Sequence, residues 1–452
     1  MVSRAILKHY NWSPAAISSS ESIDMHDTSG AIELLPPPRC NRVAALPVLG
    51  LLLTLALAGC AGHAKGVMTP VAVTGATGGS TVDMLVVTSR VPSHDPATLF
   101  TGERSPTPYL TDITVSIPSD AKRKAGTVQW PKKVPPNPET DFAVTKVQQL
   151  NSPEEGRAWF RQHVVNGHAM VFVHGFNNRY EDSVFRFAQI VHDSKAKVTP
   201  ILFTWPSRAR VFDYNYDKES TNFSRTALEQ GLQTLSKDKD VKEITVMAHS
   251  MGTWLAMESL RQMAIRDGRV QPKIKNVILA SPDIDVDVFA RQWNELGKDK
   301  PKITIFVSQD DRALKVSRLI SGDVDRLGAI NPAAEPYKTK LEAAGITVVD
   351  LTQVKTDDGL RHGKFAESPE IVQLIGQRLV TGQTLTDSDV SFADGVTAVV
   401  AGSVGTVGKV AATTVTAPLT VLEGNRIEYR RPKSDRVHET LNSKSPTPEL
   451  SY

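Results

Sequence analysis

Ser250 lies in a segment whose residue types and order suit a catalytic nucleophile. The segment reads Ala248-His249-Ser250-Met251-Gly252; it follows the apolar run 244–247 and precedes apolar residues at helical spacing. A serine on a sharp strand-to-helix turn projects its hydroxyl clear of the sheet, and the next amide N–H, that of Met251, can face a developing oxyanion. Ala248 and Gly252 are small enough to flank such a turn, although alanine replaces the usual first glycine. The alternative is an ordinary turn with a helix-capping serine.

A second motif, His174-Gly175-Phe176, follows the apolar run 169–173. In a sheet with a nucleophile turn, the loop after an earlier strand supplies the other oxyanion donor, and we assign this role to the Phe176 N–H. Gly175 allows close approach of the backbone because it has no Cβ. His174 precedes the serine in the chain, so we expect it to organise the loop rather than to act as the base.

The candidate general base is found by elimination. Catalytic groups around such a turn follow the chain order serine, acid, histidine, and only His362 and His438 come after Ser250. His438 lies in a charged tail, whereas His362 lies in the loop after the apolar run 346–349. We therefore predict that His362 is the base; the alternative is a surface histidine without a catalytic role.

Three aspartates compete for the role of the acid that orients the histidine. Asp310 and Asp311 follow the apolar run 303–307, and Asp283 follows the run 277–280. Any of them could fix the tautomer of the imidazole, and we favour Asp311. The aspartates that do not take this role would cap helices, as aspartate commonly does.

The elements that must position these residues alternate along the chain. Short apolar runs at 169–173, 200–203, 244–247, 277–280, 303–307 and 346–349 are separated by helical periodicity, and residues 84–88 form a plausible first strand. Near-continuous apolar strands indicate a mostly parallel sheet with helices on both faces. Only short intervals separate Ala280 from Ile303 and Trp205 from Glu219, so we expect no large cap domain. The aromatic residues 205, 212, 214 and 216 in the second interval could line a pocket or pack in the core.

These motifs together resemble a bacterial α/β-hydrolase family of unknown function that is described as esterase- or lipase-like. The resemblance covers about residues 84–380 and rests on the stretches 171–178, 203–207, 248–252, 281–283 and 311–314. It implies the α/β-hydrolase fold. It does not imply a particular substrate, because the reaction of the family is poorly defined.

Composition narrows the possible functions. The chain has 452 residues with 52 Lys+Arg and 49 Asp+Glu, a net charge of +3, which argues against a dedicated nucleic-acid binder. Its two cysteines are Cys40 and Cys60, so a disulfide framework, a cysteine nucleophile and a cysteine-based zinc site are excluded from the later chain. The proposed chemistry requires neither a metal nor a cofactor.

The N-terminal region has the features of an export signal. Residues 43–59 carry no charge, follow Arg39 and Arg42, and end in Leu57-Ala58-Gly59-Cys60. A basic region, an apolar run and small residues describe a secretory signal. The final tetrapeptide resembles the lipobox of bacterial lipoproteins, which implies cleavage before Cys60 and lipid modification of its thiol. An uncleaved membrane anchor is the alternative.

These features predict the organisation and location of the protein. We expect a leader and signal peptide at 1–59, a linker at 60–80, the hydrolase domain at 81–382, and an Ala/Gly/Val/Thr-rich segment with a polar tail at 383–452. The apolar run begins late, so Met25 is a candidate start. Alanine after Cys60 favours the outer over the inner membrane of the bacterial envelope.

The predicted function is ester hydrolysis through an acyl-enzyme, with a small-molecule or lipid ester as substrate. One alternative is an inactive hydrolase fold that acts as an envelope binding or scaffold protein. Another retains the three catalytic groups but cleaves amides, thioesters or peptides.

Overall fold

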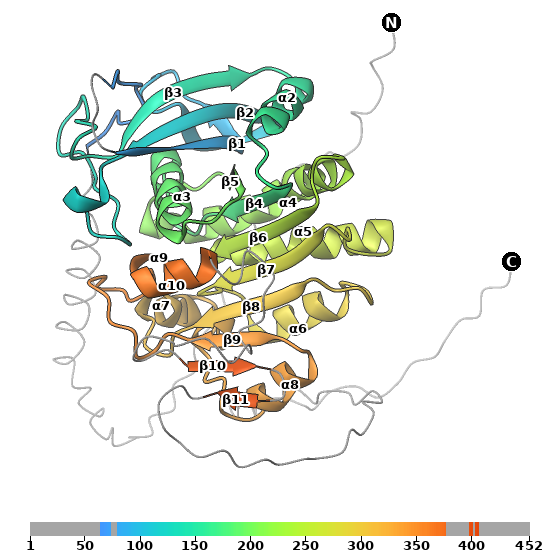
Figure 1. Ribbon diagram of the computed structural model, residues 1–452. Helices are drawn as coiled ribbons and strands as arrows, with labels where there is room; N and C mark the ends of the chain where they lie inside the picture. The colour runs from blue at the N-terminus through green and yellow to red at the C-terminus, as the bar shows by residue number, and fades with distance from the viewer. Residues whose placement is uncertain (1–63, 74–78, 377–396, 401–402, 406–452) are drawn as a thin grey trace, which may run out of the picture. The chain divides into compact units, whose positions relative to one another are not determined.

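The computed structural model describes residues 64–73, 79–376, 397–400 and 403–405, all within the second of two compact units, residues 63–452. One sheet contains the eleven described strands in the order β11-β10-β9-β8-β7-β6-β4-β5-β1-β2-β3 (Figure 1). Their bounds are β1 Ser80–Pro92, β2 Phe100–Ile117, β3 Ala143–Leu150, β4 His168–Val173, β5 Thr199–Thr204, β6 Glu243–His249, β7 Ile274–Ala280, β8 Lys302–Val307, β9 Thr347–Asp350, β10 Thr397–Val400 and β11 Ser403–Gly405.

The centre of the sheet is parallel and its two ends are antiparallel. Strands β1, β5, β4, β6, β7, β8 and β9 run in one direction, while β2 pairs antiparallel with both β1 and β3, and β10 with both β9 and β11. The inner strands β4 and β5 are buried along almost their whole length, because side chains on both faces are covered. The carboxyl ends of the parallel strands therefore meet at one edge, where the predicted site residues follow them.

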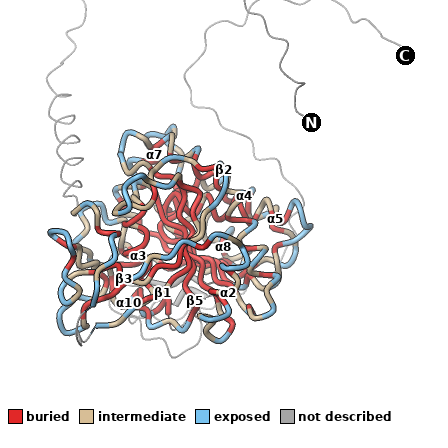
Figure 2. The backbone as a smooth tube through the Cα atoms, turned by 90° about the horizontal axis from the view of Figure 1, so that it is seen from above, coloured by how far each residue is buried: buried red, intermediate tan, exposed pale blue. Residues whose placement is uncertain are grey.

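Helices cover both faces of the sheet, as the apolar runs predicted. The bounds are α2 Pro153–His163, α3 Tyr180–Ser194, α4 Tyr214–Lys237, α5 Met251–Asp267, α6 Val286–Asn294, α7 Arg312–Ile320, α8 Tyr337–Ala343, α9 Lys364–Glu367 and α10 Pro369–Leu374. Helices α2, α4, α5, α6 and α8 contribute to the hydrophobic core on one face, and α3, α9 and α10 to the core on the other. Figure 2 shows the buried backbone running through the middle of the molecule.

No large cap is evident in the part of the chain that the structure describes. Between β7 and β8 the chain forms only the nine-residue helix α6. The predicted fold class, an α/β-hydrolase fold with a mostly parallel sheet and no large cap, is confirmed. None of the described helices is long and apolar enough to cross a bilayer.

The structure also differs from the sequence prediction at both ends of the domain. Part of the predicted linker packs into the core: Val67 and Met68 are buried against the face that α3 covers. Two strands, β10 and β11, come from the predicted C-terminal segment and extend the sheet at the β9 end. The predicted leader at 1–59, Cys60 and most of 383–452 lie outside the described residues.

Candidate active site

Ser250 occupies a strained turn between β6 and α5. Its φ and ψ are 53° and −125°, a backbone conformation that L-residues rarely adopt. The Ser250 N–H donates to Ala280 O at 2.9 Å, and Ser250 O accepts from the Asp283 N–H at 3.3 Å, so the neighbouring β7 loop holds the turn. Strain of this kind persists only where the surroundings fix it, and it is concentrated at functional sites. The serine is 5% exposed, at the carboxyl edge of the sheet.

Two glycines bring the motif after β4 against this turn. A Cβ on Gly252 would lie 2.2 Å from the backbone oxygen of His174, and a Cβ on Gly175 would lie 2.8 Å from Ser250 Cβ. Both distances are far below van der Waals contact, so the absence of a Cβ at each position permits the approach. The Phe176 amide follows Gly175 directly, and the Met251 N–H belongs to the first turn of α5, where amides lack intrahelical acceptors. Met251 therefore adjoins Ser250 in the chain, and Gly175, the residue before Phe176, lies against Ser250 in space.

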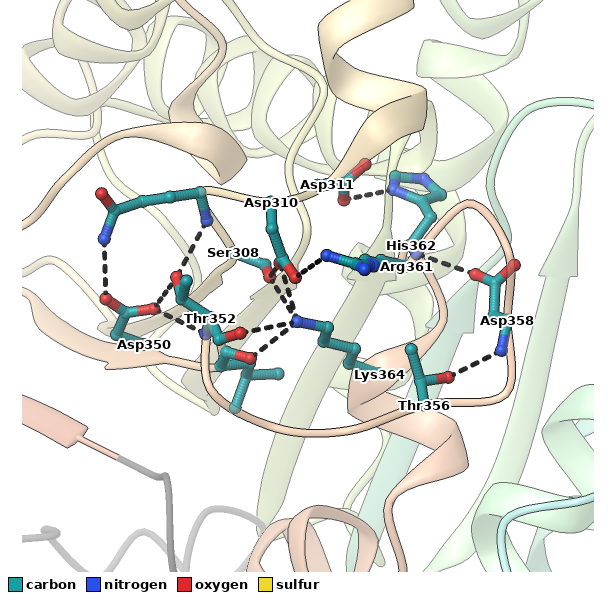
Figure 3. Close-up of polar contacts among 12 residues, drawn as sticks. Ser308, Asp310, Asp311, Asp350, Thr352, Thr356, Asp358, Arg361, His362 and Lys364 are labelled. Carbon is teal, nitrogen blue, oxygen red and sulfur yellow. Dashed lines mark hydrogen bonds and ion pairs between the residues drawn. The ribbon is translucent and has the colours of Figure 1, made fainter.

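His362 contacts Asp311, the aspartate that we favoured. His362 Nδ1 lies 2.6 Å from Asp311 Oδ2 (Figure 3). The Asp311 carboxylate is fully buried, and its other oxygen accepts from the Leu314 N–H at 2.9 Å, so the same residue is the N-cap of α7. Burial lowers the pKa of His362, but the charge and hydrogen bond of the Asp311 carboxylate, together with the charges of Asp283 and Asp358, outweigh it and raise this pKa above its usual value.

The other two candidate aspartates have different partners. Asp310 accepts from Lys364 Nζ at 2.7 Å and from Arg361 Nη1 at 3.0 Å. Asp283 accepts from Ser317 Oγ at 2.5 Å and from Tyr214 OH at 3.0 Å. Neither contacts His362 through its side chain. Asp310 and Asp283 therefore tie loops and helices together around the site.

The loop that carries His362 is held by a fourth aspartate that our sequence analysis did not single out. Asp358 Oδ2 accepts from the backbone N–H of His362 at 2.8 Å and of Gly363 at 3.2 Å. The available signal was Asp357-Asp358-Gly359, since aspartates often bond to backbone amides in turns. Lys364, only 1% exposed, adds bonds from Nζ to Leu351 O at 3.0 Å and Thr352 O at 3.1 Å (Figure 3). His362 is thus fixed through its side chain and through its backbone.

His249 connects the serine turn with His362, and our sequence analysis did not single it out. Its ring centroid lies 4.7 Å from that of His362 and 4.6 Å from that of Phe365. Burial, followed by the charge of His362, keeps the pKa of His249 well below its usual value, so the ring is neutral. Its Nε2 is buried and has no hydrogen-bond partner among the described residues. Because His249 directly precedes Ser250, this tilted ring contact brings the serine turn and His362 side by side.

His174 is enclosed in a network of hydrogen bonds instead of facing open space. Its Nδ1 lies 2.8 Å from Gly175 O, its Nε2 lies 3.1 Å from the Trp205 N–H, and the two rings stack at 4.8 Å. Burial and the charge of the buried Arg90 lower the pKa of His174 to about 3. These contacts suit the expected loop-organising role. They also place Trp205 in the core and not in a pocket, whereas Phe212 is 94% exposed.

A match to the model of a protein family identifies the class of this chain. Residues 152–378, just over half of the chain, match the model of the family described as alpha/beta hydrolase of unknown function. The protein belongs to this family. Within the described residues, no group of three His, Cys, Asp or Glu side chains could hold a metal ion.

Individual relatives are distant. An uncharacterized protein of Nostoc sp. is 35% identical over 77 residues, which cover 16% of this chain and 20% of that protein, so the match spans only a fifth of the relative's length. A candidate cell surface hydrolase of Lactobacillus plantarum matches with 11% identity, a TM-score of 0.30, and coverage of 49% of this chain and 94% of that one. A lipase-esterase related protein of Clostridium acetobutylicum matches with 13% identity, a TM-score of 0.22, and coverage of 36% and 86%.

Proposed function

We propose that this protein is a serine hydrolase that cleaves carboxylic esters. Ser250 is the nucleophile, His362 is the general base and Asp311 orients and stabilises the imidazole. The observation that carries the proposal is the 2.6 Å contact between His362 Nδ1 and the buried Asp311 carboxylate, beside the strained turn of Ser250. A histidine held this way keeps its proton on Nδ1 and leaves Nε2 free to accept one. Membership of an α/β-hydrolase family supports hydrolase chemistry in general.

The reaction has two steps. His362 Nε2 accepts the Ser250 Oγ proton while Oγ attacks the ester carbonyl, and the same proton then passes to the departing alcohol. Water next attacks the acyl-enzyme, gives its proton to His362 and releases the acid, after which Ser250 Oγ recovers the proton. The Phe176 and Met251 amides stabilise the oxyanion in both steps, and the positive end of the α5 dipole lies beside Met251.

The setting of the enzyme belongs to the same proposal. The candidate signal ending at Cys60 would attach the protein by a lipid to the bacterial envelope, with the outer membrane favoured. The absence of a large cap suits small-molecule esters or esters at a lipid surface. Acyl-chain labelling of cells that produce the wild type and Cys60→Ser tests the attachment; the label should be absent from the variant.

A panel of short-chain esters, thioesters and amides tests the reaction. The wild type should hydrolyse esters, and Ser250→Ala should lower kcat about 10³-fold or more because the nucleophile is lost. The matched control is Ser236→Ala, which alters a buried serine at the end of α4 whose hydroxyl has no partner among the described residues. If folded wild type cleaves no substrate of the panel, or if Ser250→Ala keeps its rate, the inactive scaffold becomes the better interpretation.

A further inference from the structure

Exposed apolar side chains gather on three segments beside the candidate active site. Ten large apolar residues are exposed in the described part of the chain, and six of them lie on these segments. We call these six the apolar rim: Val211, Phe212, Val316, Leu319, Ile320 and Leu360. Phe212 is 94% exposed and Leu319 is 73% exposed, so most of each residue's surface faces solvent. Contiguous exposed apolar surface of this kind marks interaction sites.

Hydrogen bonds join the three segments to one another. The 3-10 turn η2 (Val211–Asp213) leads into Tyr214, whose hydroxyl lies 3.0 Å from Ser317 Oγ of α7. At the other end of α7, the Arg312 N–H donates to Leu360 O at 2.9 Å. The rim is therefore one surface formed by η2, α7 and the loop that carries His362.

The same contacts connect the rim with the proposed catalytic groups. Asp311 both caps α7 and contacts His362. On the other side, the Tyr214 ring packs edge-on against Phe176, with centroids 5.3 Å apart. Tyr214 OH also donates to the carboxylate of Asp283, whose N–H donates to Ser250 O. The apolar rim thus borders the site on the oxyanion side and on the base side.

The residue types of α7 indicate what covers this surface. The helix reads Arg-Ala-Leu-Lys-Val-Ser-Arg-Leu-Ile; Leu314 and Ser317 face the protein, while its three cations and three of its apolar residues are exposed. It contains no acidic residue, and no acid among the described residues pairs with Lys315. Arg318 is neutralised by Asp323 and Asp325 on the following loop. Exposed apolar side chains interleaved with cations suit the interface of a bilayer with anionic lipids.

We propose that the apolar rim docks on an anionic lipid surface and that Ser250 takes its ester substrate from that surface. This inference rests on the proposed function and specifies its substrate class as a lipid ester. A second copy of the chain fits less well, because a symmetric pair would bring the Lys315 side chains of two α7 helices towards each other.

Site-specific fluorescence tests the docking without relying on the N-terminal anchor. The only cysteines of the chain are Cys40 and Cys60, so the full chain with both changed to serine can receive one new thiol. Leu319→Cys is labelled with an environment-sensitive dye, and Ile265→Cys, 63% exposed near the other end of α5, is the control. Vesicles of phosphatidylcholine with about one third phosphatidylglycerol should shift the emission at 319 to the blue and leave 265 unchanged. An unchanged spectrum at 319 on protein that sediments with the vesicles would overturn the docking.

A kinetic comparison tests the link between docking and catalysis. The quantity measured is the rate of hydrolysis of a vesicle-borne ester divided by the rate for a short soluble ester. The double variant Phe212→Ser, Leu319→Ser should lower this ratio about tenfold or more, and the control Ile265→Ser should leave it unchanged. An unchanged ratio overturns the proposal, as does a dimer in the wild type that dissociates in the double variant without vesicle binding. The dye measurement is repeated with Ser250→Ala, so a failure of the proposed esterase chemistry is separated from a failure of docking.

Discussion

Replacing Asp311 with asparagine separates two roles of this residue. In the wild type, one carboxylate oxygen accepts from the Leu314 N–H and the other lies 2.6 Å from His362 Nδ1. In Asp311→Asn, the amide oxygen can keep the helix cap only by accepting from Leu314, and the amide NH2 then faces His362. Nδ1 must become an acceptor, the ring proton moves to Nε2, and the base can no longer receive the Ser250 proton.

The expected magnitude follows from this geometry. The wrong tautomer and the loss of a charge-assisted bond should lower kcat by about 10³- to 10⁴-fold, or about 4 to 5.5 kcal/mol of transition-state stabilisation. Stability should change little, because asparagine caps helices as well as aspartate does. The pKa of His362 should also fall, because the carboxylate that raises it is removed.

The assay measures kcat/KM for a short ester as a function of pH, with thermal unfolding of the same samples. A base must be neutral, so the wild-type rate should rise with pH through a midpoint above the usual histidine value, and residual activity of Asp311→Asn should have a lower midpoint. Asp310→Asn and Asp283→Asn are the matched controls and should retain most of the rate. The reasoning is refuted if Asp311→Asn keeps more than about a tenth of the wild-type rate. It is also refuted if Asp310→Asn or Asp283→Asn shows the large loss of rate that is expected of Asp311→Asn.

Three further predictions concern the scaffold of the site. Gly252→Ala should destabilise the fold and abolish activity because its Cβ would lie 2.2 Å from a backbone oxygen. The control is Gly231→Ala in α4, where a Cβ would have no neighbour within 4 Å; it should raise the free energy of unfolding in urea by about 1 kcal/mol. The pKa of His174 is lowered to about 3, so its neutral form stabilises the fold fully above the pKa of the unfolded chain. The free energy of unfolding should therefore decrease as the pH falls from about 6.5, by up to about 1.4 kcal/mol per pH unit, and less steeply in His174→Asn. Lys364→Met should lower the free energy of unfolding by about 3 kcal/mol, because it removes four hydrogen bonds and leaves the partly buried Asp310 with one cation fewer. Equal midpoints of urea unfolding for the variant and the wild type would contradict this.

The central part of the fold could be predicted from the sequence because its signal is local. The strands β4 to β9 are apolar runs buried on both faces, and each was found from its own composition. The ends of the sheet gave no such signal. Residues 61–80 are rich in Gly, Ala and Thr, yet Val67 and Met68 lie in the same core as Phe100, and β10 depends on pairing with β9. Long-range pairing decides these segments, and local composition does not record it.

The candidate site shows the same division. Ser250 and Gly252 could be selected because a tight strand-to-helix turn dictates its own residue types. The sequence analysis favoured Asp311 but left Asp310 open, because both follow β8 at the same edge and the direction of each side chain distinguishes them. The role of His249 depends on a ring contact with a residue more than a hundred positions later, which no spacing rule contains.

The most direct test of the account is fluorophosphonate labelling of the full chain, with the modified residue located by mass spectrometry. An activated serine reacts with this reagent, whereas an ordinary serine hydroxyl does not. We predict a single adduct on Ser250 that is absent from Ser250→Ala and forms far more slowly in His362→Ala and Asp311→Asn. Folded wild-type protein that remains unlabelled, or an adduct on another serine, would contradict the assignment of Ser250 as the nucleophile.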